Sequence, residues 1–377
     1  MAGGFWYNGT NVRVRRRRMS QSFAIAVLPG DGIGPEVMAE ALRVLRATEA
    51  RLDGVRFELR EAAVGAGQYL RGGDPLPPAA FDLCRACDAI LLGAMGLPGV
   101  RWPSGTEMTP QIDLRERLDL YCGLRPIRLY HERDTPLKGY AAGDIDLLLV
   151  RENTQGLFST RTQAYPPDAE QVTDTLLVTR GGSQRVFRAA FEQARQRRGH
   201  VTLVDKANVL PSMAYFRGIF DEIAKGFTDV RAERAYVDAM SLFLVQRPDR
   251  YDVLVTENMF GDILSDLAAG LVGGMGMAAS ADIGDEHAVF QPAHGTAPDI
   301  AGQGIANPVA MILSTAMMLD WLGHPETRRG GQMIRAAVEQ VLADPANRTA
   351  DLRGEKSTSF MGQAIARHIA DGWSQGR

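Results

Sequence analysis

The chain has 377 residues, 45% of them hydrophobic, and a formal net charge of −3. This length allows two lobes or domains, and the balanced charge gives no reason to expect nucleic-acid or membrane binding. No apolar run reaches the ~18 residues that a membrane span requires. Three cysteines in so long a chain favour a reducing compartment, the cytoplasm, over a disulfide framework.

The N-terminal segment 1–22 differs from the rest because it contains five arginines and no acidic residue. It has no apolar stretch of the kind found in secretory signals. We therefore expect a disordered basic leader before the folded region.

Alternating apolar and amphipathic segments follow. Segment 23–29 predicts a buried strand, 30–34 (GDGIG) a turn, and Pro35 the first position of a helix. The later segments, in chain order within each type, are strands at 89–94, 146–152, 200–207 and 251–257, and helices at 184–198, 211–225, 260–271, 307–321 and 330–343. This alternation predicts an α/β fold with a mostly parallel sheet and helices on its faces.

The glycine turn does not match the dinucleotide-binding fingerprint. Gly30, Gly32 and Gly34 are spaced G-x-G-x-G rather than G-x-G-x-x-G, and a proline follows. No acidic residue stands at a clear strand end about 20 residues on, so a standard Rossmann site is not expected.

Two aspartates stand four residues apart in the apolar segment NMFGDILSD. On a helix, Asp262 and Asp266 would share a face and repel each other. A bound divalent cation would relieve this repulsion, and so would exposure to water.

Other charged residues lie in apolar surroundings. Three arginines near strand ends or helix faces could clamp carboxylates, although a single arginine is more often a surface ion pair: Arg115, Arg125 and Arg151. Lys206 directly follows a buried strand, where a lysine can act as a base. Asp238 would add a third carboxylate to Asp262 and Asp266, giving the oxygen ligands that Mg²⁺ or Mn²⁺ prefers.

Six ordered motifs resemble the β-decarboxylating dehydrogenases, which act on 3-isopropylmalate, isocitrate, homoisocitrate and tartrate or D-malate. The motifs run from about residue 23 to the C-terminus and read LPGDGIGPEV, LRERLDLYCGLRP, VRENTQGLF, VDKANVL, ENMFGDILSDLAAGLVGGMG and HGTAPDIAGQGIANP. The resemblance implies a two-lobed open sheet of the isopropylmalate dehydrogenase type. One lobe would comprise 23–120 plus 273–377, and an inserted lobe, 121–272, would carry the dimer interface.

The resemblance also implies roles for individual residues. Arg115, Arg125 and Arg151 correspond to the arginines that hold the substrate carboxylates, and Asp238, Asp262 and Asp266 to the metal ligands. Lys206 corresponds to the general base, which with Asp238 comes from the partner subunit of a homodimer. Asn208 corresponds to a residue near the nicotinamide, and the adenosine loop comprises His294, Gly295, Thr296, Ala297, Asp299 and Asn307. An anion at Asp299 would accept hydrogen bonds from both ribose hydroxyls and repel a 2′-phosphate, so NAD is expected rather than NADP.

The chain departs from the family at Phe158, where the family has the tyrosine that protonates the enolate after CO₂ leaves. Such an acid typically contributes about 10²–10⁴-fold. Water or another side chain could protonate the enolate, the enzyme could oxidise without decarboxylating, or the chain could be a non-catalytic or regulatory paralogue. We favour a working dehydrogenase because the other charged positions are all present.

The residues expected to choose the substrate are mixed in character. Gln111 suits an isopropyl group poorly and Ile112 suits it well, whereas Thr109 resembles the hydroxyl residue with which isocitrate enzymes meet a third carboxylate. The sequence therefore predicts an unsubstituted or 3-substituted (R)-malate as the anionic hydroxy-acid substrate.

Overall fold

The computed structural model describes residues 21–163, 165, 166 and 168–372. Residues 1–20 of the expected leader therefore lie outside the described residues. Its last two residues, Gln21 and Ser22, belong to the first strand and pair with Val55 and Arg56, so the expected boundary at residue 23 was two residues too late. No helix in the described part of the chain combines the length and the apolar character needed to cross a bilayer.

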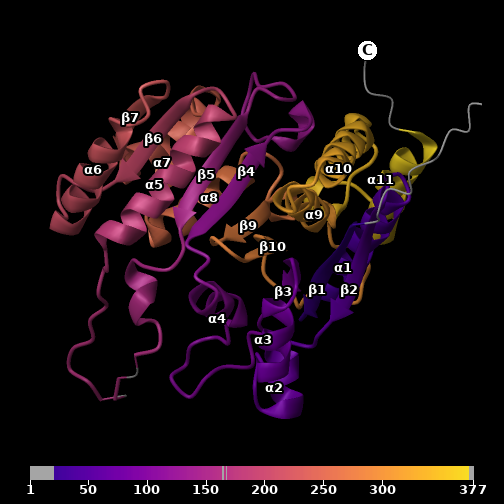
Figure 1. Cartoon of the computed structure of the whole chain (residues 1–377), viewed down its shortest axis with the longest axis horizontal. Helices are drawn as coiled ribbons and strands as arrows, with labels where there is room; N and C mark the ends of the chain where they lie inside the picture. The colour runs from indigo at the N-terminus through magenta and orange to yellow at the C-terminus, as the bar shows by residue number, and fades with distance from the viewer. Residues whose placement is uncertain (1–20, 164, 167, 373–377) are drawn as a thin grey trace, which may run out of the picture.

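Ten strands form one open, twisted sheet in the order β2-β1-β3-β10-β9-β4-β5-β8-β6-β7 (Figure 1). Six of the nine described strand pairings are parallel, which confirms the prediction of a mostly parallel sheet. The strands are β1 (Gln21–Gly30), β2 (Val55–Glu61), β3 (Ala89–Ala94), β4 (Cys122–Arg128), β5 (Asp146–Glu152), β6 (His200–Asp205), β7 (Arg231–Tyr236), β8 (Val253–Thr256), β9 (Ala279–Ile283) and β10 (Ala288–Pro292).

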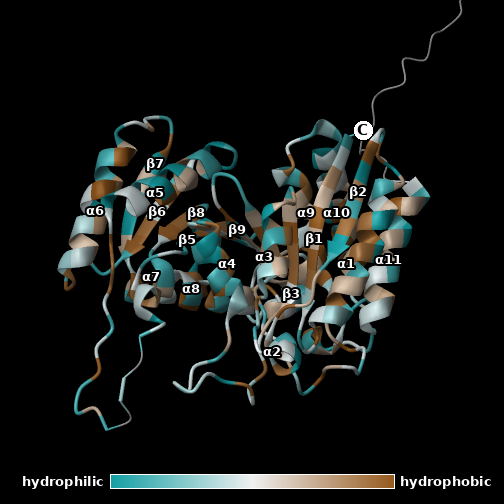
Figure 2. Cartoon of the chain, turned by 60° about the horizontal axis from the view of Figure 1, so that its bottom comes forward, coloured by the Kyte–Doolittle hydropathy of each residue, from teal (hydrophilic) through white to brown (hydrophobic). Residues whose placement is uncertain are grey.

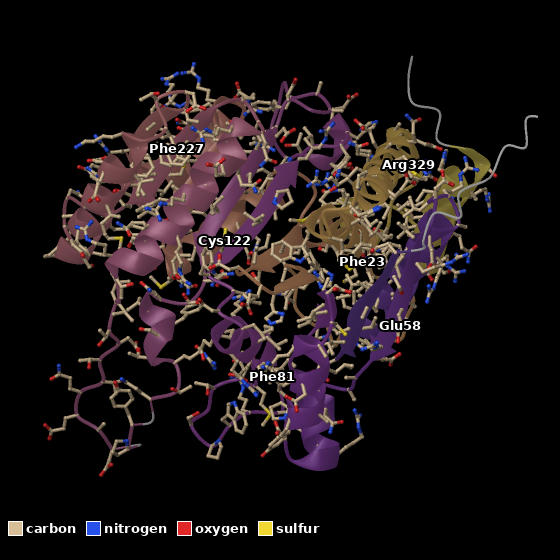
Figure 3. The ribbon with its side chains drawn as sticks, viewed as in Figure 1. Phe23, Glu58, Phe81, Cys122, Phe227 and Arg329 are labelled. Atoms are coloured by element: carbon tan, nitrogen blue, oxygen red, sulfur yellow. The ribbon has the colours of Figure 1, made fainter. Side chains whose placement is uncertain are left out.

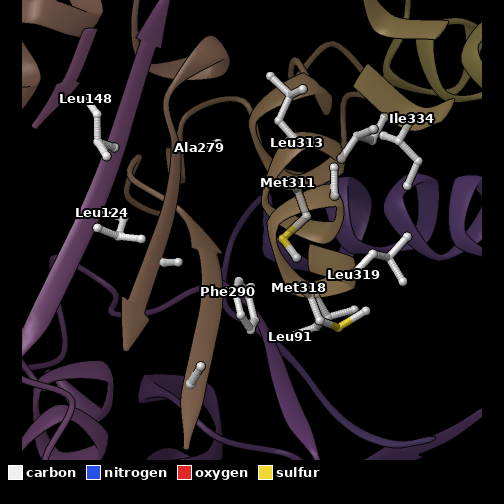
Figure 4. Close-up of a cluster of buried hydrophobic side chains, with 14 of the residues drawn as sticks. Leu91, Leu124, Leu148, Ala279, Phe290, Met311, Leu313, Met318, Leu319 and Ile334 are labelled. Atoms are coloured by element: carbon white, nitrogen blue, oxygen red, sulfur yellow. The ribbon is translucent and has the colours of Figure 1, made fainter. Parts of the chain in front are cut away.

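Helices cover both faces of this sheet (Figures 1 and 2). They are α1 (Gly34–Glu49), α2 (Ala66–Gly72), α3 (Pro78–Arg85), α4 (Pro110–Arg117), α5 (Arg180–Arg195), α6 (Pro211–Ala224), α7 (Val237–Gln246), α8 (Asn258–Gly270), α9 (Val309–Trp321), α10 (Pro325–Ala343) and α11 (Thr358–Gly372). The largest core cluster contains side chains of α1, α5, α6, α9, α10 and α11 (part of it in Figure 4), and two smaller clusters lie under α3 with α4 and under α7 with α8.

The two ends of the sheet come from different parts of the chain. Strands β2, β1, β3, β10 and β9 belong to the segments 23–120 and 273–377, apart from the first two residues of β1, and the other five strands to 121–272. The ends meet where β9 pairs antiparallel with β4, and Cys122 near the middle of Figure 3 pairs there with Ile283. The division into two lobes, with its boundaries, remains a prediction.

Candidate active site

Three elements bring buried arginines together. Arg115 lies on α4, Arg125 on β4 and Arg151 on β5, and they are 5%, 5% and 1% exposed. Burial and, after it, the nearby charge of Arg115 lower the pKa of Arg151 to about 10, although Asp262 opposes the shift. Burial also lowers the pKa of Arg125, with Arg115 again a neighbouring positive charge. The three arginines predicted as a clamp therefore share one electrostatic environment.

The three guanidinium groups differ in their partners. Arg115 donates from Nε to Asp282 Oδ2 at 2.9 Å. Arg151 donates from Nε and Nη2 to Asn258 Oδ1 at 3.0 and 2.6 Å, and its Nη1 pairs with Asp262. Arg125 makes no side-chain hydrogen bond with any described residue, and its Nε is buried. A buried guanidinium without a partner is costly, so Arg125 indicates a site that an anionic ligand completes.

Helix α8 is positioned by its first turn and by a glycine. Glu257 precedes the helix and accepts hydrogen bonds from the amides of Met259 and Phe260 at 3.1 and 2.6 Å. A Cβ atom on Gly261 would lie 2.7 Å from Cγ of Arg151, so glycine permits this close approach of helix and arginine. Asp262 is thereby brought against the buried guanidinium.

Asp262 and Asp266 lie on one helix, α8, as the sequence predicted. The pKa of Asp266 is raised, first because of burial and second because of the negative charge of Asp262. Two carboxylates this close together on one helix form a donor set that suits a divalent cation. Within a single chain, the described residues contain no cluster of three acidic, histidine or cysteine side chains able to hold a metal. Asp238 is therefore not beside this pair in its own chain.

Lys206 and Asp238 instead pair with each other. Lys206 Nζ lies 2.9 Å from Asp238 Oδ1, and the side chain of Asp238 is 67% exposed. The hydrogen bond from Lys206 lowers the pKa of Asp238. Asn208, three residues before α6, is exposed. No hydrogen bond or ion pair joins these residues to the arginine cluster within the described part of the chain.

The glycine turn supports the loop at residues 294–299. Ile33 donates its amide to the carbonyl of Thr296 at 2.9 Å. Gly32 has φ +57°, and a Cβ there would lie 2.1 Å from that carbonyl oxygen, so no other residue fits. The unusual glycine spacing thus serves a backbone contact between the turn and the loop.

The loop presents polar groups without partners. Nε2 of His294 is buried with no hydrogen-bond partner, while Nδ1 lies 2.8 Å from the Gly295 carbonyl, and burial lowers the histidine's pKa. Asp299 is exposed, and its carboxylate makes no hydrogen bond with any described residue; only its carbonyl accepts one, from Gln303. Ala297 has φ +37°.

Asn307 is buried and already bonded. Its Nδ2 donates to Asp351 at 3.1 Å and to the sulfur of Met277 at 3.5 Å, and its Oδ1 accepts from the amide of Val309. These contacts hold the start of α9, so the side chain meets a ligand only if they change.

A pocket of about 350 Å³ adjoins the arginine cluster. Thr109 and Ile112 from the start of α4 line it together with Phe158, and the guanidinium of Arg151 lies 5.4 Å from the Phe158 ring. Gln111 has a buried Oε1 without a partner. The residues predicted to choose the substrate thus surround or adjoin one pocket.

Two residues at the site were not predicted. Asn258 accepts both hydrogen bonds from Arg151, and Asp282 on β9 accepts from Arg115, Asn153 and Gln291. The signal was present, because an aspartate in the short apolar run ASADI is out of place unless it is paired.

The structure thus places a cluster of buried arginines in an open α/β sheet. The family model described as isocitrate/isopropylmalate dehydrogenase matches residues 24–365, and the chain belongs to this family. It is therefore an oxidoreductase of the decarboxylating hydroxy-acid dehydrogenase class, whose members use a nucleotide cofactor and a divalent metal.

Individual relatives cover nearly the whole chain. A 3-isopropylmalate dehydrogenase of Moorella thermoacetica is 44% identical over 93% of this chain and 100% of its own length. A 3-isopropylmalate/3-methylmalate dehydrogenase of Methanocaldococcus jannaschii is 41% identical over 92% and 99%. The crystal structure of isocitrate dehydrogenase from Methylococcus capsulatus superposes with a TM-score of 0.82 at 39% identity, covering 92% of this chain and 99% of that one.

Proposed function

We propose that this chain catalyses the NAD-dependent oxidation, with decarboxylation, of an (R)-malate-type hydroxy acid, assisted by Mg²⁺ or Mn²⁺. A 3-isopropylmalate-like substrate comes first, and isocitrate, homoisocitrate, tartrate and D-malate are the alternatives. The observation that carries the proposal is the buried guanidinium of Arg125, which has no partner among the described residues. The similarity to enzymes named 3-isopropylmalate dehydrogenase supports the order of substrates.

The arginines orient the substrate. Arg125, which is 5% exposed and has no hydrogen-bond partner among the described residues, is the primary partner for a substrate carboxylate. Arg115 is held through Nε only, which leaves both terminal nitrogens without a hydrogen bond to any described residue. Arg151 is fixed by Asn258 and Asp262, so it supplies a rigid positive charge.

The proton of the substrate hydroxyl goes to Lys206 of a second copy, through water. Asp262 and Asp266, with Asp238 of that second copy, would hold the divalent cation, which when bound polarises the keto oxygen and stabilises the enolate. The raised pKa of Asp266 beside Asp262 supports this ligand set.

NAD is favoured by the free carboxylate of Asp299. Its exposed side chain makes no hydrogen bond within the described residues, so it is available to a ribose diol and repels a 2′-phosphate. The buried, unpaired Nε2 of His294 in the same loop is a second group that a cofactor would satisfy.

A homodimer is supported by exposed apolar side chains around the Lys206–Asp238 pair. Leu242 and Val245 of α7 are 53% and 44% exposed, and Ile263 of α8 is 59% exposed. Apolar faces of this kind are typical of surfaces that pack against another protein. The long segment between Phe158 and α5, which extends away from the rest of the protein in Figures 1 and 2, also exposes Val172.

The three described free cysteines are all buried, which agrees with a cytoplasmic location.

The proposal is tested by measuring NADH and CO₂ together for 3-isopropylmalate, isocitrate, homoisocitrate, tartrate and D-malate with Mn²⁺. We expect both products from one substrate. NADH without CO₂ would support a second candidate that Phe158 favours, a dehydrogenase that does not decarboxylate. Absence of NADH with every substrate and with either nucleotide would point instead to a non-catalytic subunit.

The shared site is tested by mixing inactive variants. Lys206→Ala and Arg125→Met damage residues that different copies would contribute to one site, so each variant alone should be an inactive dimer. In a 1:1 mixture after refolding, half of the dimers are mixed and each contains one intact site, giving about a quarter of wild-type activity. No recovery, with mixed dimers shown to form, would mean that the site lies within one chain.

A further inference from the structure

Asp282 occupies the middle of the sheet, where the two ends join. It lies on β9, opposite Gly123 of β4 and Val289 of β10, and is 0% exposed. A charge in such a place is tolerated only when it is paired and hydrogen-bonded.

All the described partners of the Asp282 carboxylate are side chains. Oδ2 accepts from Arg115 Nε at 2.9 Å and from Gln291 Nε2 at 2.6 Å, and Oδ1 accepts from Asn153 Nδ2 at 2.8 Å. Burial raises the pKa of Asp282, but Arg115 and Arg125 outweigh this effect and hold it below its usual value. Asp282 is therefore a buried anion at neutral pH.

This anion acts on the whole arginine cluster. Asp282 attracts the guanidinium of Arg125 more strongly than Asp262 or Asp266 does, and it also stabilises the charged form of Arg151. With Asp282 paired to Arg115 and Asp262 paired to Arg151, Arg125 is the one guanidinium of the three without a carboxylate in the described chain.

The adjoining pocket contains no unpaired positive charge among its lining residues that could bind a further carboxylate. Its arginine, Arg161, already pairs with Asp113 at 2.5 Å and with Glu116 at 2.8 Å. Another lining residue, Glu107, is itself acidic, and Ile112 and Phe158 contribute apolar surface. Apart from neutral donors such as Thr109, a third carboxylate in this pocket would meet acids and an arginine that is already paired.

We propose that Asp282 is a positioning and specificity-determining residue, which fixes Arg115 through Nε and sets the site for substrates with two carboxylates rather than three. This inference rests on the proposed function and narrows its substrate class. A 3-substituted malate with an uncharged substituent fits the site, and a tricarboxylate such as isocitrate is disfavoured by one buried negative charge.

The test compares kcat and KM for a dicarboxylate and a tricarboxylate in two variants. Asp282→Asn keeps the size of the side chain and removes its charge, and should lower the kcat/KM preference for the dicarboxylate about tenfold. The double variant Asp282→Asn with Gln291→Glu returns a negative charge to the same hydrogen-bonded pair, and should restore the preference to within about threefold.

Asp134→Asn is the matched control. Asp134 forms an equally buried ion pair with Arg348, whose two bonds are 2.8 and 3.0 Å, away from the site. This change should lower the melting temperature and leave the substrate preference unchanged. An unchanged preference in Asp282→Asn, or no recovery in a folded double variant, would overturn the inference.

Different results would contradict the proposed function and the proposed role of Asp282. If the wild-type protein oxidises none of the substrates, the proposed function fails, and the role of Asp282 is then measured by calorimetric binding of 3-isopropylmalate and isocitrate with Mg²⁺. If the wild type is active but Asp282→Asn retains the preference, the inference alone fails. A wild type that prefers a tricarboxylate also contradicts the inference.

Discussion

Arg125 should make the free protein less stable while making substrate binding possible. The guanidinium is 5% exposed and has no hydrogen bond to any described residue, and burial lowers its pKa despite the attraction of Asp282, Asp262 and Asp266. The desolvation cost thus exceeds the compensation from neighbouring charges. We expect Arg125→Met, which keeps most of the side-chain volume, to raise the free energy of unfolding by about 1–3 kcal/mol.

The same change should nearly abolish turnover. Loss of a buried charge partner costs about 2–5 kcal/mol in binding, so kcat/KM should fall about 10³-fold. Stability is measured by urea unfolding without substrate or metal, at one protein concentration because the proposed dimer couples folding to association. Activity is measured as NADH formation.

Arg151 provides a matched comparison, because it is equally buried but bonded. Arg151→Met would leave Asn258 Oδ1 without its two donors and Asp262 without its cation, so this variant should lose about 2 kcal/mol of stability. A loss of stability in Arg125→Met comparable to that in Arg151→Met would show that Arg125 is satisfied in the free protein, and the reasoning about an anion site would be wrong.

Three further predictions concern chemistry, cofactor and pH. Phe158→Tyr places a hydroxyl beside Arg151, and should raise the ratio of CO₂ to NADH if enolate protonation limits the second step; an unchanged ratio of one in both proteins would show another proton donor. Asp299→Asn should raise kcat/KM for NADP relative to NAD about tenfold, measured as two initial-rate series, and an unchanged ratio would remove Asp299 from cofactor choice. Burial raises the pKa of Glu257 above its usual value. At a pH above this folded-state pKa, the buried carboxylate is charged and lowers the free energy of unfolding. At a pH below the pKa of the unfolded state, the carboxyl is protonated in both states and the loss of stability disappears. Glu257→Gln should therefore gain about 1 kcal/mol more stability at about pH 8 than at about pH 4, and equal changes at both would contradict this sign.

The elements that were predicted best are those in which burial requires apolar residues at most positions. Segment 89–94 is a continuous apolar run and segment 146–152 has an apolar centre, LLLV; both are buried along nearly their whole length, and they match β3 and β5 to the residue. Segment 251–257 was longer than β8, and helix 184–198 begins earlier, at Arg180, because Thr179 caps it through Gly182. Boundaries depend on such single contacts, which periodicity does not encode.

Two of the strands that were missed, β7 and β9, lack that pattern. Strand β7 reads RAERAY and is exposed along one edge of the sheet, and β9 is five residues long with an aspartate inside it. Both are held by pairing with neighbours rather than by their own composition. The same reason hid Asp282, because its partner Arg115 is 167 residues away in the sequence.

The proposed division of the site between two copies is the part that is hardest to recognise in a single chain. Lys206 and Asp238 satisfy each other at 2.9 Å, so neither is left unpaired in a way that would reveal a missing partner. The indication comes instead from their surroundings, where Leu242 and Val245 remain half exposed on the helix that carries Asp238. We expect a second copy to pack on this apolar surface and the substrate to bind at the buried guanidinium of Arg125. If the dimer covers α7, we expect it to bring Lys206 of one copy to the arginine cluster of the other. The mixed-dimer experiment measures directly whether the two copies share one active site.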